Sequence, residues 1–183
     1  MRFERISKYP EVNLPQRATT GAAGYDFECA DTVTILPHTI CLLPTGIKCQ
    51  IDDGCYLQLA LRSSTPKKKG LMLANGIGIV DSDYYNNPDN EGHIMFQVYN
   101  FTDEDVCIEK GERIGQGVFI KYFKTDNDLA TDLRVGGFGS TDITGAQKDA
   151  INKGLTASLD EIFGFGGEGG FFSSLMGGDC FND

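Results

Sequence analysis

Apolar and polar residues alternate in short runs along most of the chain between Val33 and Phe123. The alternating apolar positions are Leu57, Leu59 and Leu61, then Ile94, Phe96 and Val98, then Ile114, Val118 and Ile120. Such alternation is typical of strands that bury one face, and the Pro, Gly, Asn and Asp residues between the runs indicate turns. Many short strands at this spacing predict an all-β body built as a sandwich, a jelly roll or a small barrel.

The pattern changes after residue 142. Thr144 to Gln147 has the form of a capping box, and apolar residues then recur at helical spacing as far as Ile162. From Gly164 onward the chain is rich in glycine and phenylalanine and has no strand or helix period. We therefore expect one β domain over residues 1–142, an amphipathic helix over residues 143–163 and a flexible tail over residues 164–183.

The chain has 183 residues and a formal net charge of -10. Proteins that coat nucleic acid neutralise its phosphates with Lys and Arg, so this charge argues against direct nucleic acid binding. A compact anionic ligand would need a local cluster of cations or a bridging metal ion. The candidate cations are Arg62, Lys67, Lys68, Lys69, Arg113 and Arg134.

The N-terminus carries charges where a secretory signal needs a continuous apolar stretch, and no later run is long enough to span a bilayer. We expect a cytoplasmic protein without membrane contact. The six cysteines form no C-x-x-C pair, and only His38 and His93 could add imidazole ligands. The sequence therefore predicts reduced, mostly buried thiols and no structural zinc.

The segment from Asn75 to Pro88 has the strongest features of a functional site. Glycines at 76 and 78 interrupt an apolar run and leave main-chain donors and acceptors uncovered, so a flat ligand can approach the backbone closely. Asp81 follows where this strand is expected to end. The alternative is a hairpin whose Asp-Ser-Asp cluster only accepts hydrogen bonds from turn amides. The segment alone leaves both interpretations open.

Two further segments carry groups that suit phosphate oxygens. Arg62, Ser63 and Ser64 offer a guanidinium, hydroxyls and freed amides, although an ordinary strand-to-turn junction would look the same. The three lysines that follow are expected to form a solvated turn. Gly136 to Thr141 could be a closing arm, in which Phe138 stacks on a planar group while Arg134, Ser140 and Thr141 bind phosphate. The alternative is a plain linker.

Taken in order, these segments closely resemble the five motifs of the homotrimeric deoxyuridine triphosphatases. The matching segments are Ala22 to Asp26, Arg62 to Ser64, Asn75 to Tyr84, Gly111 to Gln116, and Arg134 to Thr141. The resemblance spans about Leu14 to Thr141. It implies a β jelly roll assembled as a threefold ring, with active sites built from more than one subunit. The reaction it implies is the Mg²⁺-dependent hydrolysis of dUTP to dUMP and pyrophosphate, which supplies dUMP and limits uracil in DNA.

The resemblance also implies roles for single residues. Asp81 would activate the water that attacks the α-phosphorus, and Asp26 would contact Mg²⁺ through bound waters. Asn75 and the main chain near Gly78 would bind the uracil edge, while Tyr84 would pack beneath the sugar and exclude a 2'-hydroxyl.

The remaining roles concern the phosphates and the arm. Arg62, Ser63, the Ser64 amide and Gln116 would hold phosphates, and Phe138 from a neighbouring subunit would cap the base. Arg134, Ser140 and Thr141 would bind the terminal phosphate oxygens.

Three features depart from the family pattern. The fifth motif is one residue shorter and ends at Asp142, the segment from Tyr85 to Gly92 is longer than the usual tight turn, and the tail is long. Two alternatives remain at this stage. One is a dCTP deaminase, which shares the jelly roll and in some members also hydrolyses its product, although the phosphate-closing arm of the fifth motif argues against it. The other is a regulatory protein that binds a partner through the Tyr85 to Gly92 loop or through the tail.

Overall fold

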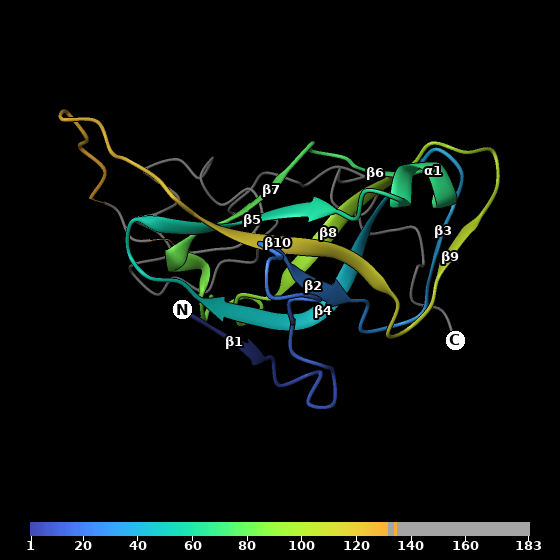
Figure 1. Cartoon of the computed structure of the whole chain (residues 1–183), viewed down its shortest axis with the longest axis horizontal. Helices are drawn as coiled ribbons and strands as arrows, with labels where there is room; N and C mark the ends of the chain where they lie inside the picture. Colours follow the sequence, from blue (N-terminus) through green and yellow to red (C-terminus); the bar gives the residue numbers. More distant parts are fainter. Residues whose placement is uncertain (132–133, 135–183) are drawn as a thin grey trace, which may run out of the picture. The chain divides into compact units, whose positions relative to one another are not determined.

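The computed structural model describes residues 1–131 and residue 134, and these residues form an antiparallel β structure (Figure 1). The strands are β1 (Arg2–Arg5), β2 (Tyr25–Glu28), β3 (Val33–Ile35), β4 (Ile40–Gln50), β5 (Cys55–Leu61), β6 (Leu71–Leu73), β7 (Gly78–Val80), β8 (Ile94–Asn100), β9 (Val106–Ile108) and β10 (Arg113–Lys121). The helical elements in this part are α1 (Thr65–Lys69) and a short 3-10 turn (Ser82–Tyr84). The all-β prediction is confirmed. The expected helix and tail over residues 143–183 lie outside the described residues.

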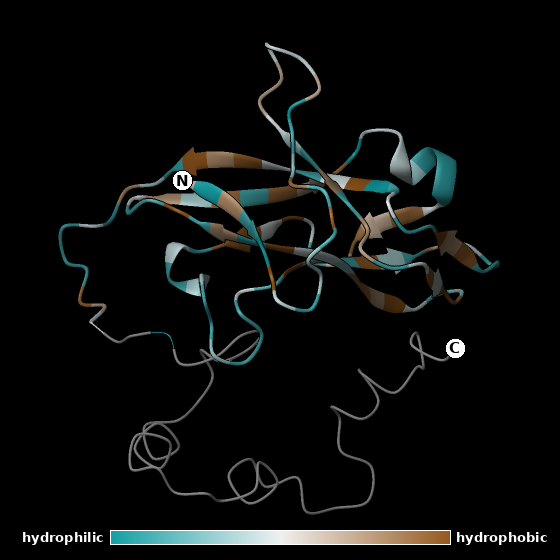
Figure 2. Ribbon diagram, turned by 90° about the horizontal axis from the view of Figure 1, so that it is seen from below, coloured by the Kyte–Doolittle hydropathy of each residue, from teal (hydrophilic) through white to brown (hydrophobic). Residues whose placement is uncertain are grey.

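The strands form two four-stranded sheets and one two-stranded sheet. The first sheet has the order β1-β4-β8-β6, the second has the order β2-β10-β5-β7, and β3 pairs with β9. Buried apolar side chains of the first two sheets form the core, and Figure 2 shows the hydrophobic stretches along these strands. The rings of Phe27 on β2 and Phe96 on β8 pack edge to face, with 5.7 Å between their centroids.

Alternation identified the inner face of β5 and β8 correctly, but on β10 it held only at Ile114. Leu57 and Leu59 on β5, the apolar residues 94, 96 and 98 on β8, and Ile114 are buried. Beyond Ile114, Gly115 and Gly117 face the core, while Val118 is only partly buried and lies opposite Gln58. A Cβ at Gly115 would overlap the Phe96 ring, and one at Gly117 would come within 2.9 Å of Leu57. Glycine is needed there because neighbouring side chains fill its space.

His93 fixes an irregularity in β4. The pairing of β4 with β8 shifts register between Pro44 and Ile47. The backbone N–H groups of Thr45 and Gly46 there donate to His93 Nε2 at 3.2 and 2.9 Å. Burial lowers the pKa of His93 to about 4, so the imidazole stays neutral and can accept both bonds at physiological pH.

The described cysteines form no disulfide bond with one another. Cys29, Cys41, Cys49 and Cys55 are buried, and Cys107 is exposed. Burial raises the pKa of Cys29 to about 11, so this thiol stays protonated. Within the described part of the chain, no helix has the length and apolar character needed to cross a bilayer.

Candidate functional site

Asp81 lies at the centre of an acidic cluster that also contains Asp83, Tyr84 and Arg134. Asp81 leaves the end of β7 in an extended conformation, and the 3-10 turn that follows carries Asp83 and Tyr84. Arg134 Nη2 donates to Asp81 Oδ2 at 2.6 Å, and Arg134 Nε donates to Asp83 Oδ1 at 2.8 Å. Asp81 makes no side-chain capping bond to the turn, so the hairpin interpretation does not account for this acid.

The cluster perturbs the proton affinity of Asp81. Partial burial raises the pKa of the Asp81 carboxyl above its ordinary value, the Arg134 guanidinium opposes this effect, and the negative charge of Asp83 adds to it. Half of the Asp81 side chain remains exposed to solvent. A carboxylate that water can reach and whose pKa is raised has the properties of a general base.

The strand β7 lies at the edge of its sheet, next to β5. One side of its main chain is therefore unpaired within the described residues and could bind a flat polar ligand. Gly76 has a φ of 76°, which glycine adopts without strain, and the exposed Asn75 precedes it in this turn. A Cβ at Gly78 would approach Leu59 to 2.9 Å, so this glycine permits close packing on β5.

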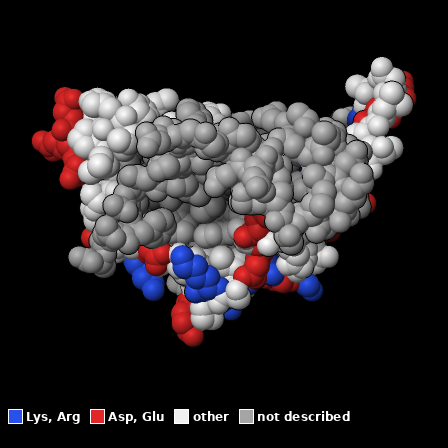
Figure 3. All heavy atoms as spheres, turned by 180° about the vertical axis from the view of Figure 1, so that it is seen from behind, with Lys and Arg blue, Asp and Glu red and all other residues white. Residues whose placement is uncertain are grey.

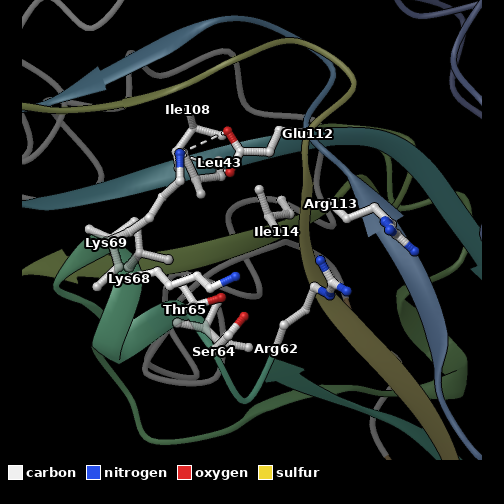
Figure 4. A pocket seen from close by; sticks show the side chains of 13 residues that line it. Leu43, Arg62, Ser64, Thr65, Lys68, Lys69, Ile108, Glu112, Arg113 and Ile114 are labelled. Carbon is white, nitrogen blue, oxygen red and sulfur yellow. Dashed lines mark hydrogen bonds and ion pairs between the residues drawn. The ribbon is translucent and has the colours of Figure 1, made fainter.

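A second group of site residues, the cationic cluster of Arg62, Ser64, Lys68, Lys69 and Arg113, surrounds a cavity of about 190 Å³. Figure 4 shows Arg62 and Arg113 reaching out beside β10, while the ion pair of Lys69 with Glu112 closes another side.

The three lysines were expected in a solvated turn, but residues 65–69 form the short helix α1. The Ser64 side chain makes no capping bond to this helix and is therefore available to a ligand.

Asp26 and Gln116 lie beside the cationic cluster. They are direct neighbours in the pairing of β2 with β10, and Gln116 is also opposite Ala60 on β5. Asp26 Oδ2 accepts a hydrogen bond from Arg113 Nη1 at 3.1 Å. Among the residues that the structure describes, no group of three or more His, Cys, Asp or Glu side chains could enclose a metal ion. Asp26 could therefore provide a metal ion with one carboxylate ligand, but not with a complete set of protein ligands.

The acidic and cationic clusters lie at opposite ends of one strand. In the antiparallel pair of β5 and β7, Val80 is opposite Leu57, which brings Asp81 level with Tyr56. Arg62 follows the far end of β5, six positions beyond Tyr56. At a rise of about 3.3 Å per residue, the two ends are roughly 20 Å apart. One chain therefore does not bring Asp81 and Arg62 to the same ligand.

The structure thus divides the predicted site residues into three sets. The first set is Asn75, Gly78, Asp81, Tyr84 and Arg134, which belong to the β7 segment (residues 75–84) or contact it. The second set is Asp26, Arg62, Ser63, Ser64 and Gln116. The third set, Phe138, Ser140 and Thr141, lies outside the described residues. No role was expected for Asp83 or Asn90. The sequence alone does not indicate that Asp83 binds Arg134 or that Asn90 binds Tyr84.

Charged side chains of both signs lie close together on the described surface. Figure 3 shows Lys and Arg beside Asp and Glu on one face, without a broad basic area among the residues coloured there. This distribution agrees with the net charge and does not favour binding along a nucleic acid backbone.

Comparisons with known proteins identify the family. A family model described as dUTPase matches residues 10–142 of the chain. The chain is 52% identical over 143 residues to deoxyuridine 5'-triphosphate nucleotidohydrolase of Lactococcus lactis subsp. lactis (strain IL1403), and the match covers 76% of this chain and 95% of that protein. It is 38% identical over 137 residues to the protein of that name from Hydrogenobaculum sp. (strain Y04AAS1), covering 72% and 91% of the two chains.

A solved structure agrees with this result. The crystal structure of dUTPase from Streptococcus mutans superposes with a TM-score of 0.67 at 49% sequence identity, and the match covers 68% of this chain and 98% of that chain. The family model matches more than half of the chain, and its residues include all five motifs. The chain therefore belongs to the dUTPase family.

Proposed function

We propose that this protein hydrolyses dUTP to dUMP and pyrophosphate. The observation that carries the proposal is the Asp81 carboxylate, which is accessible to water and has a raised pKa at the end of an edge strand. Asp81 accepts a proton from a water molecule as the water oxygen attacks the α-phosphorus. The bond from that phosphorus to the bridging oxygen breaks, and pyrophosphate leaves.

The β7 segment holds the nucleoside end of the substrate. Asn75 and the unpaired main chain around Gly78 bind the uracil edge, and the edge position of β7 supports this role. Tyr84 packs beneath the deoxyribose, where its ring leaves no space for a 2'-hydroxyl. A wrong base leaves buried polar groups without partners, which adds to the discrimination.

The cationic cluster holds the phosphates. Arg62, Ser63, the Ser64 amide and Gln116 bind phosphate oxygens, and their grouping at one end of β5 supports this assignment. The arm contributes Phe138 over the base and Ser140, Thr141 and Arg134 at the terminal phosphates. Arg134 binds Asp81 and Asp83 in the structure, so it must exchange these partners when it binds phosphate.

Mg²⁺ suits this arrangement. It prefers oxygen ligands and keeps several of its waters, so a site with one nearby carboxylate fits an ion carried mainly by the triphosphate. Asp26 would hold it through water, and the ion would neutralise charge on the phosphate oxygens.

A ring of three subunits would bring the two clusters together. With roughly 20 Å between the ends of β5, a complete site takes Asp81 from one subunit and Arg62 from another. An apolar row on the first sheet is available for such contacts, because Ile40 and Met72 are each half exposed and both lie opposite Tyr99 on β8. A cytoplasmic location stays a prediction.

A panel of nucleotides with Mg²⁺ tests the function. We expect pyrophosphate release from dUTP to exceed that from dTTP and UTP by at least about a hundredfold in kcat/KM. A close fit of Asn75 and the Gly78 main chain around the uracil edge would exclude a 5-methyl group, and Tyr84 would exclude a 2'-hydroxyl. Pyrophosphate and ammonia should be followed together. Ammonia from dCTP would favour a dCTP deaminase, and equal rates across the panel would contradict this binding mode.

The pH dependence of kcat/KM for dUTP tests the role of Asp81, because this parameter reports ionisations of the free enzyme. A general base must be deprotonated, so activity should fall as the pH drops through the raised pKa of Asp81, above the ordinary 3.8. Asp83→Asn should move this acidic limb to lower pH because a like charge is lost, and Arg134→Gln should move it to higher pH. Identical limbs in all three proteins would contradict the assignment.

A further inference from the structure

The hydroxyl of Tyr84 is held by the longer loop from Tyr85 to Gly92. Asn90 Nδ2 donates to Tyr84 Oη at 2.8 Å, and Tyr84 Oη donates to the His93 carbonyl at 3.1 Å. Only 8% of Tyr84 is exposed, and the Arg134 guanidinium lies 5.7 Å from the centre of its ring. The loop therefore binds the hydroxyl of Tyr84, an aromatic residue of the acidic cluster.

The orientation of the Asn90 amide is determined by its second contact. Asn90 Oδ1 accepts a hydrogen bond from the Gly92 backbone N–H at 3.0 Å, which leaves the NH₂ group to face Tyr84. The backbone carbonyl of Asn90 also accepts a hydrogen bond from the backbone N–H of His93 at 3.0 Å. The side chain and the backbone of Asn90 are thus both bonded to the turn that leads into β8.

The loop itself is attached to the N-terminal part of the domain. Lys48 Nζ on β4 donates to Asn86 Oδ1 at 2.7 Å, and Tyr85 Oη donates to Glu4 Oε2 on β1 at 2.8 Å. The Ser7 backbone N–H donates to Glu91 at 3.1 Å. These bonds fix the loop, and Asn90 with it. The hydrogen bond from Asn90 therefore holds the Tyr84 ring in place.

We propose that Asn90 is a positioning residue that sets the tilt of the Tyr84 ring and thereby strengthens discrimination between deoxyribose and ribose. This inference rests on the proposed function, because it needs Tyr84 beneath the sugar. A ring held at its hydroxyl by both Asn90 and the His93 carbonyl has less freedom to move away from a 2'-hydroxyl than a ring that keeps only the bond to His93. Asp81 keeps its own contacts, so the chemical step with dUTP is left unchanged.

The test compares kcat and KM for dUTP and for UTP in the full-length protein and its variants. Asn90→Ala removes both side-chain bonds, while Asn90→Ser keeps an oxygen for the Gly92 N–H but is too short to reach Tyr84. We expect the preference for dUTP over UTP to fall about fivefold in both, as the loss of one neutral hydrogen bond predicts. The kcat for dUTP should stay within about twofold of wild type.

Tyr85→Phe is the matched control, because it removes one bond between the loop and Glu4 at the same 2.8 Å and does not contact the Tyr84 hydroxyl. It should keep the wild-type preference. In a Tyr84→Phe background, Asn90→Ala should have no further effect on the preference, since the acceptor is already absent. Melting temperatures measured in parallel report loop stability separately.

The outcomes separate the two proposals. A wild-type protein that hydrolyses dUTP, together with variants of Asn90 that keep the full preference, would overturn the role of Asn90 alone. An equal fall in Tyr85→Phe would also overturn it, because the effect would then come from loop stability. A wild-type protein that does not hydrolyse dUTP would overturn the proposed function, and the role of Asn90 with it.

Discussion

Asp81→Asn should lower kcat for dUTP by a factor between about 10² and 10⁴, the usual contribution of a positioned general base. Asparagine has nearly the same shape but cannot take the proton from water. Because burial already disfavours the charged form of Asp81, a neutral amide should fit the same place without unfolding the protein. The measurement is single-turnover hydrolysis, combined with the melting temperature and the binding of a non-hydrolysable dUTP analogue.

Asp83→Asn is the matched control for this experiment. Asp83 binds the same guanidinium as Asp81, and the exposed fractions of the two side chains are close, at 55% and 50%. Its loss should leave kcat largely intact, because the proposed reaction needs one base at the α-phosphorus. Undiminished turnover in Asp81→Asn would end the assignment. An equal loss in both variants would indicate that the pair of acids holds Arg134 rather than activates water.

Two inactive variants should restore activity when they assemble together. Asp81→Asn removes the base from one end of β5, and Arg62→Ala removes a phosphate ligand from the other end. If a site takes these residues from different subunits, a mixed ring contains sites that combine the intact half of each variant. With random mixing in equal amounts, about a quarter of the sites should be intact. Co-expression with two affinity tags isolates such rings for assay.

The control for complementation is a pair of variants in the same half of the site. Asp81→Asn and Asn75→Ala both alter the β7 segment, so no arrangement of these chains contains an intact β7 segment. This mixture should stay at the level of its parents. If the first mixture also stays there although mixed rings form, sites shared between subunits are ruled out.

The β strands could be predicted because alternation reports burial directly, as Leu57 and Leu59 on β5 illustrate. On β10 it held at Ile114 and failed beyond it, because the next inner positions are glycines, which leave the space that Phe96 and Leu57 occupy. The family and the fold follow from five short motifs in order, and the comparisons confirm both.

Other features could not be predicted because they depend on contacts between distant residues. Arg134 is 53 positions from Asp81, and no local pattern indicates that its guanidinium binds both acids. Nothing in the sequence indicates the hydrogen bond from Asn90 to Tyr84 either, since an asparagine in a loop is ordinarily a turn residue. The placement of Asp81 and Arg62 at opposite ends of β5 became visible only from the strand register.

If sites are shared as proposed, that placement makes activity depend on assembly. A single chain then carries Asp81 of one site and Arg62 of another, so it contains no complete site. Progressive dilution should therefore switch turnover off while the circular dichroism spectrum remains that of a native β protein, because assembly follows mass action. The specific activity of the protein would then depend on its concentration in the cell.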